Sequence, residues 1–349
     1  MLDVLVVGQG IAGSLIALQC IKRNLSFYVI DAPEKSRASK VAAGIINPIT
    51  GRKYVKTWMY EELQKEFVSM YRWTEDLLSG EYLNEREIYR TIPTVKDQNQ
   101  WDARLLEKGA SPFMQTAEDA GDFEGKLFDR QGFGLVNGYQ LRMDQLIKDL
   151  RKYLEERKYY SSEIFDHASL EINEKAVRYK KWITAHVIFC EGHAVSQNPF
   201  FNELPFAPAK GELLLVRIPN FQTDHILKDQ LFFVPLERDI FWVGASYAWD
   251  EFSDQPTGEK EKWLIEGIEK VLNVPYEIID HKAGIRPATK YRKPFIGSHS
   301  AYPSLHLFNG LGTKGASLGP YFAKALMASV FDQKTLHPEV DIQRFDNVL

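Results

Sequence analysis

The sequence predicts an α/β fold, and three features of its first thirty-one residues lead to this prediction. An uninterrupted apolar run at residues 5–7 is typical of a parallel strand that is buried on both faces. An expected helix over residues 11–22 is preceded by three glycines at G-x-G-x-x-G spacing: Gly8, Gly10 and Gly13. A second apolar strand at residues 27–31 ends in an acid, Asp31. Strand, glycine turn, helix and strand in this order predict a Rossmann-like domain.

The glycine turn and Asp31 together indicate a dinucleotide site. The first glycine allows the tight turn, the second lets the backbone approach a pyrophosphate, and the third lets the helix pack close to the strand. The N-terminus of that helix offers free N–H groups and a dipole that favour an anion. Asp31 follows Gly13 at the distance where an acid accepts hydrogen bonds from ribose hydroxyls. The motif alone does not choose between NAD and FAD, and a glycine-rich turn without a nucleotide is the alternative interpretation.

Length and composition allow two domains or one large α/β unit in 349 residues. The net charge of −4 gives no reason to expect DNA or another nucleic acid as an electrostatic partner. Neither the two cysteines, Cys20 and Cys190, nor the eight histidines have metal-ligand spacing, so we expect buried thiols in a reducing compartment and no metal. Because no apolar run reaches membrane-spanning length and no secretory signal is recognisable, we expect a cytoplasmic protein.

A loop rich in small residues follows Asp31 and ends near residue 51. Its small residues at 42–44 would let the backbone pass close to a flat ligand. Ser36 and Ser39 have hydroxyl groups that suit phosphate oxygens, as do the local N–H groups. The alternative is a plain surface loop, but the position of this loop after a dinucleotide unit favours a ligand site.

The middle of the chain predicts a departure from the nucleotide domain and a return to it. Residues 58–78 have apolar and aromatic side chains at helical spacing, which we interpret as core. Residues 82–134 mix short strand-like pieces, charges and turns, and so predict an excursion. Residues 139–154 have the pattern of an amphipathic helix, and residues 316–331 that of a final helix.

Three later motifs point to chemistry. A buried strand at residues 185–190 ends in Glu191 and Gly192, and open α/β sheets bind ligands at the carboxyl ends of their strands. Arg286 lies in a Gly-Ile-Arg-Pro run. A glycine loop at residues 310–315 precedes the last helix, so its N–H groups and the helix dipole would favour an anion.

These motifs, in this order, resemble the FAD-dependent D-amino acid oxidase family, which includes glycine and sarcosine oxidases. Five stretches carry the resemblance and span almost the whole chain: the glycine motif ending in Asp31, the loop at residues 39–48, residues 190–192, residues 284–287 and residues 310–315. Residues 47–52 and 312–315 are also similar to the FAD domain of bacterial enzymes that modify tRNA wobble uridines.

The resemblance implies an α/β Rossmann-like FAD-binding domain made of residues 1–80, 135–200 and 295–349. It implies an α+β substrate domain with a mixed antiparallel sheet, made of residues 81–134 and 201–294. We expect noncovalent FAD, because no cysteine follows residue 190 near the arginine motif, where some relatives attach the cofactor. The implied cofactor contacts are Gly8, Gly10, Ile11, Ala12, Gly13, Asp31, Ala32, Ser39, Ala43, Gly44, Ile45, Glu191, Gly192, Gly310, Gly312, Thr313, Lys314 and Gly315.

The reaction that the resemblance implies is oxidation of a C–N bond, with a hydride passing from the substrate carbon to flavin N5. Arg286 matches the carboxylate-binding arginine of the family, and its planar fork suits a bidentate carboxylate; a structural ion pair is the alternative. Lys314 would add positive charge beside the flavin, or would face solvent. Further substrate-binding candidates are Tyr247 and Arg52, with Trp249 and Lys53 as weaker ones.

Three functions stay open at this point. The leading one is an oxidase or dehydrogenase of an amino acid or N-alkylated glycine, with O₂ or another electron acceptor. The second is the demodification of carboxymethylaminomethyl-type groups on tRNA, whose amine and carboxylate would suit the same Arg286, although no basic run marks a tRNA surface. The third is a non-catalytic flavin-binding protein.

Overall fold

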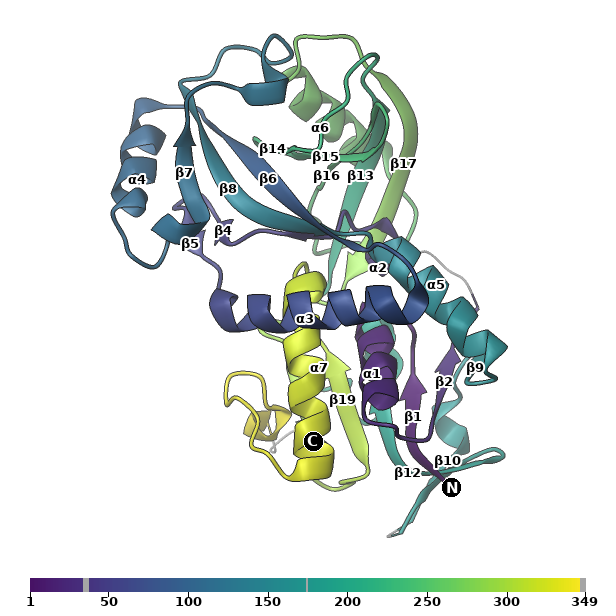
Figure 1. Cartoon of the computed structure of the whole chain (residues 1–349). Coiled ribbons are helices and arrows are strands. Elements are labelled where there is room, and N and C mark those ends of the chain that lie inside the picture. The colour runs from purple at the N-terminus through teal and green to yellow at the C-terminus, as the bar shows by residue number, and fades with distance from the viewer. Residues whose placement is uncertain (34–37, 174, 346–349) are drawn as a thin grey trace.

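The computed structural model describes residues 1–33, 38–173 and 175–345, and within them the chain forms two main sheets, one below the other in Figure 1. The lower sheet has the order β10-β11-β12-β1-β2-β9, with β19 beside β12 and β18 beside β19. Its central pairs β12–β1, β1–β2 and β12–β19 are parallel. Its strands are β1 (Leu2–Val7), β2 (Phe27–Asp31), β9 (Tyr160–Ser162), β10 (Leu170–Ile172), β11 (Val177–Tyr179), β12 (Trp182–Phe189), β18 (Phe295–Ser298) and β19 (Leu305–Asn309).

Strand β1 is buried on both faces, as its sequence predicts. Val4 and Val6 pack into the core on the side of the main helices, whereas Leu5 and Val7 pack into a second core on the opposite side. Figure 1 shows α3 running across α7 and α1 on the helical side. The helices of this half are α1 (Ile11–Lys22), α2 (Ala38–Val41), α3 (Tyr60–Leu78), α5 (Met143–Glu156) and α7 (Gly315–Asp332).

The upper sheet is mostly antiparallel and has the order β17-β13-β16-β15-β14-β6-β8-β3, with β7 beside β8. Helix α6 packs on its far face through Leu264 and Ile268, so one face is covered and the other faces the lower sheet. Its strands are β3 (Ile45–Ile46), β6 (Leu83–Ile92), β7 (Met114–Ala117), β8 (Gly132–Leu141), β13 (Ala209–Arg217), β14 (Ile226–Lys228), β15 (Phe232–Glu237), β16 (Ile240–Gly244) and β17 (Glu277–Arg286).

Short elements complete the fold and border the space between the sheets. A hairpin of β4 and β5 lies next to the upper sheet (Figure 1). These remaining elements are β4 (Ile49–Thr50), β5 (Val55–Lys56), α4 (Val95–Leu105), α6 (Gly258–Glu269) and the 3-10 turns Ser111–Phe113, Gly121–Phe123, His167–Ser169, Gly192–Gln197 and Ile342–Phe345. The predicted fold class, a Rossmann-like domain with a mixed-sheet second part, is confirmed.

Two local predictions differ from the structure. The helix expected at residues 139–154 begins only at Met143, because residues 139–141 end strand β8 and pair with β6 and β3. The excursion expected as short pieces contains one ten-residue strand, β6, paired along its length with β8. Strand β8 crosses the predicted boundary at residue 135 and lies in the upper sheet, and the domain boundaries themselves stay a prediction.

None of the described helices combines the length and the apolar character that crossing a bilayer requires.

Candidate active site

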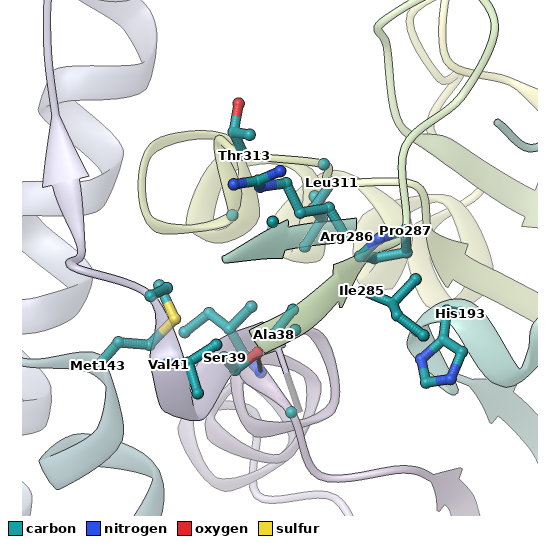
Figure 2. A pocket seen from close by; sticks show the side chains of 18 of the residues that line it. Ala38, Ser39, Val41, Met143, His193, Ile285, Arg286, Pro287, Leu311 and Thr313 are labelled. Atoms are coloured by element: carbon teal, nitrogen blue, oxygen red, sulfur yellow. Dashed lines mark hydrogen bonds between the residues drawn. The ribbon is translucent and has the colours of Figure 1, made fainter. Parts of the chain in front are cut away.

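A cavity of about 1000 Å³ lies between the two sheets. Its floor is formed by the loops that follow the carboxyl ends of β1, β2, β12 and β19, the edge where open α/β sheets bind ligands. Its roof is the inward face of β13, β15, β16 and β17. Figure 2 shows residues of α2, α5 and the end of β17 converging on this space. The cavity therefore joins motifs that lie far apart in the sequence.

The glycine turn has the shape that the sequence predicts. Gly8 has a φ of +96°, a backbone conformation that side chains rarely allow. A Cβ on Gly13 would lie 1.8 Å from the carbonyl oxygen of Gly8, so α1 can approach β1 only because this position is glycine. Ser39 accepts a hydrogen bond from the Ile11 amide at 3.1 Å and brings α2 against the start of α1. The turn is thus open to the cavity and closed on its other side.

Asp31 ends β2 inside a polar cluster. Its carboxylate accepts hydrogen bonds from the Gln9 amide at 2.8 Å and from the Arg151 guanidinium at 2.9 Å, and the Tyr160 hydroxyl lies 3.4 Å away. The Asp31 side chain is 3% exposed. Arg151 also donates to the Gln9 side chain at 2.7 Å. These contacts fix the orientation of the acid at the cavity wall.

Glu191 and Gly192 follow β12 on the same side of the cavity. The Glu191 carboxylate lies 2.8 Å from the His167 ring and accepts a hydrogen bond from the Asn198 amide at 2.7 Å. Asn309, at the end of β19, donates to the Gly192 carbonyl at 2.9 Å. The ends of two parallel strands are therefore tied together at the cavity floor.

The glycine loop before α7 presents Lys314 to the cavity. Lys314 is half-buried and has no acidic partner among the described residues. Burial lowers the pKa of its amine, and the nearby charges of Lys293 and Arg292 lower it further. Helix α7 begins directly after Lys314 with no side-chain cap and no acid in its first turn. Positive potential is therefore concentrated at this wall.

Arg286 ends β17 and extends toward the loop that carries Leu311 and Thr313 (Figure 2). Its Nη1 donates to the carbonyl oxygens of Lys210 and Ser246, each at 3.3 Å, and its guanidinium lies 4.2 Å from the centre of the Tyr247 ring. A Cβ on Gly211 would lie 1.9 Å from Arg286 Nη2, so glycine leaves room for the guanidinium. Burial lowers the pKa of Arg286, and Tyr247 acts in the opposite direction.

Most residues singled out from the sequence line this cavity, including Ala12, Ala32, Ala43, Gly44, Ile45, Arg52 and Tyr247. Gly13 and Gly310 do not line it and instead lie packed against neighbouring backbone and side chains. Trp249 and Lys53 are exposed and also lie outside the lining. Ser36 falls outside the described residues. Shared lining supports these residues as contacts, and their individual roles stay predictions.

Sequence reasoning missed the roof of the cavity. Leu213, Lys228, Phe232 and Trp242 line it from three antiparallel strands and the neighbouring β14. Trp242 is held by a hydrogen bond from its indole to the Val41 carbonyl at 2.8 Å. The period-two alternation of these strands could have identified one inward face, but not the partner that this face meets.

The residues present fit a dinucleotide cofactor. Two helices, α1 and α7, start at the cavity without caps from their N-cap side chains and without acids in their first turns. The Ile11 amide of α1 is bound by Ser39, and the N-terminal ends of both helices still favour a phosphate or an anionic ring. Asp31 lies at the end of β2, where a ribose would be bound. Gly8 and Gly10 of the turn line the cavity, so a pyrophosphate bound there would be within reach of the backbone.

A dinucleotide cradle facing a cationic cavity wall is the arrangement that a flavin-dependent oxidoreductase requires, and comparison with known proteins places the chain in that class. The chain belongs to the DAO family: the family model described as FAD dependent oxidoreductase matches residues 3–329. The predicted family, its FAD cofactor and its oxidoreductase class are thereby confirmed.

Curated relatives and solved structures agree with this assignment. The chain is 23% identical to the bifunctional protein ThiO/ThiG of Nostoc sp. over 95% of its length but spans only 53% of that relative. It is 22% identical to glycine oxidase of Pseudomonas aeruginosa, with 93% of both chains covered. It is 23% identical to the tRNA 5-methylaminomethyl-2-thiouridine biosynthesis bifunctional protein MnmC of Campylobacter jejuni, over 84% of this chain and 46% of the relative. The structure of glycine oxidase from Bacillus cereus shares the fold, with a TM-score of 0.80, 18% identity and coverage of 100% and 98%.

Proposed function

We propose that this protein oxidises the C–N bond of an amino acid or an N-alkylated glycine, and that Arg286 binds the substrate carboxylate. The observation that carries the proposal is that the Arg286 guanidinium lacks an acidic partner. It is half-buried at the cavity wall, yet no Asp or Glu among the described residues pairs with it. A buried charge without a partner is costly, so a carboxylate from a ligand would complete this site.

The surroundings of Arg286 support a fixed orientation of the bound substrate. Two backbone carbonyls hold Nη1, and Tyr247 covers one face of the guanidinium. Nη2 makes no hydrogen bond to a protein acceptor among the described residues and is the nitrogen for which Gly211 leaves space. The side chain can therefore present donors to a carboxylate without reorganising.

The chain would hold the cofactor on the floor of the same cavity. The α1 N-terminus would bind its phosphates, Asp31 its ribose, and Lys314 with the α7 N-terminus would stabilise negative charge at the opposite end. Bound FAD supplies the acceptor for the hydride and its two electrons. Loss of the hydride and of the amine proton leaves an imine, which water hydrolyses to a carbonyl compound and an amine. O₂ or another acceptor would then take up the electrons.

The test is anaerobic bleaching of the flavin by a panel of amines that differ in their carboxylate. Glycine, sarcosine and N-ethylglycine should bleach the flavin, and the corresponding amines without a carboxylate should not. Arg286→Ala should lower kcat/KM for the acids by about 10²–10⁴ while FAD content stays near normal. Arg286→Lys should recover part of this loss, because lysine keeps the charge and lacks the fork.

Arg178→Ala is the matched control, because Arg178 is exposed on β11 away from the cavity. An Arg286→Ala variant that loses FAD and melting temperature together, with carboxylate dependence intact, would show a structural arginine instead. Tight FAD binding without bleaching by any amine would favour a non-catalytic flavin protein.

A second candidate is demodification of a carboxymethylaminomethyl group on tRNA, in which oxidation and hydrolysis of the C–N bond release the carboxymethyl arm and leave an amine on the base. The similarity to MnmC, which extends over 84% of this chain, favours this candidate. The modified base also carries a secondary amine and a carboxylate, so Arg286 would bind it in the same way. Bleaching by the modified nucleoside but not by free N-alkylglycines would select this function.

A further inference from the structure

Lys228 is a further cation of the cavity wall, far from Arg286 along the upper sheet. It ends β14, is half-buried, and has no acidic partner within ion-pair distance among the described residues. Its amine donates to the Gln230 carbonyl at 2.9 Å and lies 4.5 Å from the centre of the Phe232 ring. The proposed oxidation assigns Lys228 no role, and no acid in the described part of the chain forms an ion pair with it.

Further positive charge lies beside Lys228. In the pairing of β14 with β6, Lys228 lies opposite Arg90. Arg90 donates to the Gly51 carbonyl at 2.8 Å, so the exposed Arg52, next in the chain, lies in the same region. Burial lowers the pKa of the Lys228 amine to about 8; the Arg90 charge lowers it as well, and Asp229 acts in the opposite direction. Asp229 is itself bound to Arg130 at 3.1 Å and to Thr91 at 2.6 Å. Within residues 1–33, 38–173 and 175–345, the acid next to Lys228 is therefore engaged by other groups and forms no ion pair with the lysine.

The wall between the two cations is apolar. On neighbouring strands, Lys228 lies opposite Phe232, Phe232 opposite Gly244, and Gly244 opposite Leu213, so these residues form one row across the sheet. The row ends on β17 at Lys282, four residues before Arg286. Four strand spacings and four residues along β17 place the Cα atoms of Lys228 and Arg286 on the order of 23 Å apart. Both residues line the same cavity.

We propose that Lys228 binds a second carboxylate of the substrate, so that the preferred substrate is an amine with acids at both ends of an apolar spacer. The inference rests on the proposed function, because Arg286 must hold the first carboxylate. Phe232, Gly244 and Leu213 would contact the spacer, and Arg90 and Arg52 would add attraction from the side. A phosphate without a spacer would leave this apolar row uncovered.

The experiment compares N-alkylglycines whose alkyl chain ends in a carboxylate with matched chains that end in a primary amide. The chain length is varied from two to eight methylene groups, because the spacing of the charges sets an optimum. At that optimum the terminal acid should raise kcat/KM by about 10- to 100-fold over the amide, the range for a hydrogen bond to a charged group.

Variants then assign the preference to Lys228. Lys228→Met should raise KM for the diacid to the level of the amide and leave kcat unchanged, since a contact remote from the reacting bond acts on binding. Lys228→Arg should retain most of the preference. Lys262→Met, on an exposed position of α6, is the control for loss of one positive charge. Calorimetry with the non-oxidisable diacid 1,6-hexanedioic acid gives a readout that does not need turnover.

The outcomes separate this inference from the proposed function. If amides and acids are oxidised equally well at every chain length, the second carboxylate site is wrong and the amine oxidation stands. If none of these amines bleaches the flavin, the proposed function fails first. An acid preference that survives in Lys228→Met would overturn the assignment of the site to this residue.

Discussion

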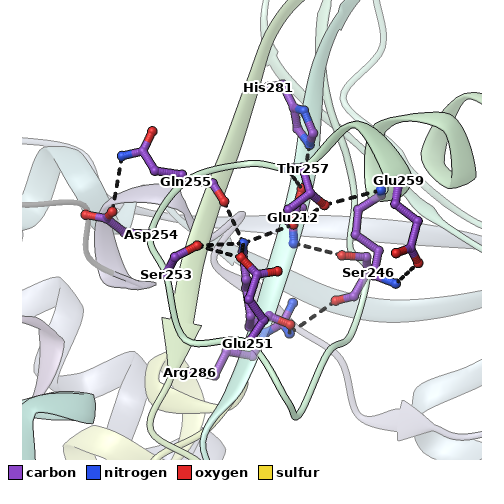
Figure 3. Close-up of polar contacts among 12 residues, drawn as sticks. Glu212, Ser246, Glu251, Ser253, Asp254, Gln255, Thr257, Glu259, His281 and Arg286 are labelled. Carbon is purple, nitrogen blue, oxygen red and sulfur yellow. Dashed lines mark hydrogen bonds and ion pairs between the residues drawn. The ribbon is translucent and has the colours of Figure 1, made fainter.

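Lys210 and Arg286 lie on neighbouring strands of one sheet, yet Lys210 is paired with acids and Arg286 is not. The Lys210 amine is fully buried and lies 2.7 Å from Glu251 and 3.3 Å from Glu212, with Ser253 and the Gln255 carbonyl completing its contacts (Figure 3). Among the described residues, the Arg286 guanidinium donates to neutral carbonyl oxygens and contacts an aromatic ring, with no acid as a partner. One cation is neutralised inside the fold, and the other is left to the cavity.

The presence or absence of an acidic partner inside the fold distinguishes structural charges from binding charges in this molecule. Glu212 also accepts two hydrogen bonds from Thr257 and lies 2.9 Å from His281, so the Lys210 cluster pins the segment between β16 and α6. That segment carries Tyr247, which covers Arg286. The buried pair therefore positions the loop, whereas the unpaired arginine is available for chemistry.

The largest expected effect that tests this comparison is on stability. Lys210→Met should lower the free energy of unfolding by about 3–5 kcal/mol, because Glu212, 1% exposed, would keep a buried charge without its cation. Arg286→Met should change it by less than about 1 kcal/mol, because no buried acid loses a partner. Urea unfolding of both holoproteins, with equal slopes, measures the two values.

Turnover of carboxylate substrates should distinguish the same two variants in the opposite direction. Arg286→Met should lose turnover of carboxylate substrates at nearly unchanged stability. Equal losses of stability in the two variants would remove the distinction between a structural and a binding cation.

Local patterns predicted the floor of the site because each floor motif is complete within a few residues. The turn from Gly8 to Gly13, the acid at Asp31 and the loop at Lys314 each combine a strand end with a glycine or helix start. The boundary at Met143 was missed because residues 139–141 take their strand conformation from pairing with β6 and β3.

The roof could not be predicted in the same way. Lys228 reaches the cavity through the pairing of β14 with β6, more than a hundred residues away in the chain. Two of the groups around the Lys210 amine, Glu251 and the Gln255 carbonyl, come from a loop 41 and 45 residues further on, whereas Glu212 is a near neighbour in sequence. Whether a charge is paired is thus a tertiary property, and residue type alone does not reveal it.

Asp31 combines features of a structural charge and of a binding charge. It is paired with Arg151, yet it also borders the cavity. Asp31→Ala should weaken FAD binding by about 1–3 kcal/mol, the cost of losing hydrogen bonds to a charged group. Arg151→Met keeps the carboxylate and should weaken FAD less. Titration of apoprotein with FAD measures both, and unchanged affinity in Asp31→Ala would leave Asp31 a purely structural partner of Arg151.

The smallest expected effect is the pH dependence of diacid binding at Lys228. The charged groups around this amine are Arg90 on β6, Arg52 in the adjoining turn and Asp229 next in the chain, while Asp97 on α4 acts on Arg90. With a pKa lowered to about 8, the amine is charged below that pH and neutral above it. Affinity for the diacid should therefore be flat below pH 8 and fall by up to about tenfold per pH unit above it.

Two variants make this pH profile specific to Lys228. Lys228→Arg should keep diacid affinity flat to higher pH, because arginine stays protonated there, and Lys228→Met should be weak and flat throughout. Calorimetry between pH 6 and 9.5 compares all three proteins, with a monoacid of equal length as the reference for Arg286. If the wild-type profile matches that of Lys228→Met, the unpaired lysine does not bind the second acid, and lack of an internal partner would not be sufficient to mark a binding charge.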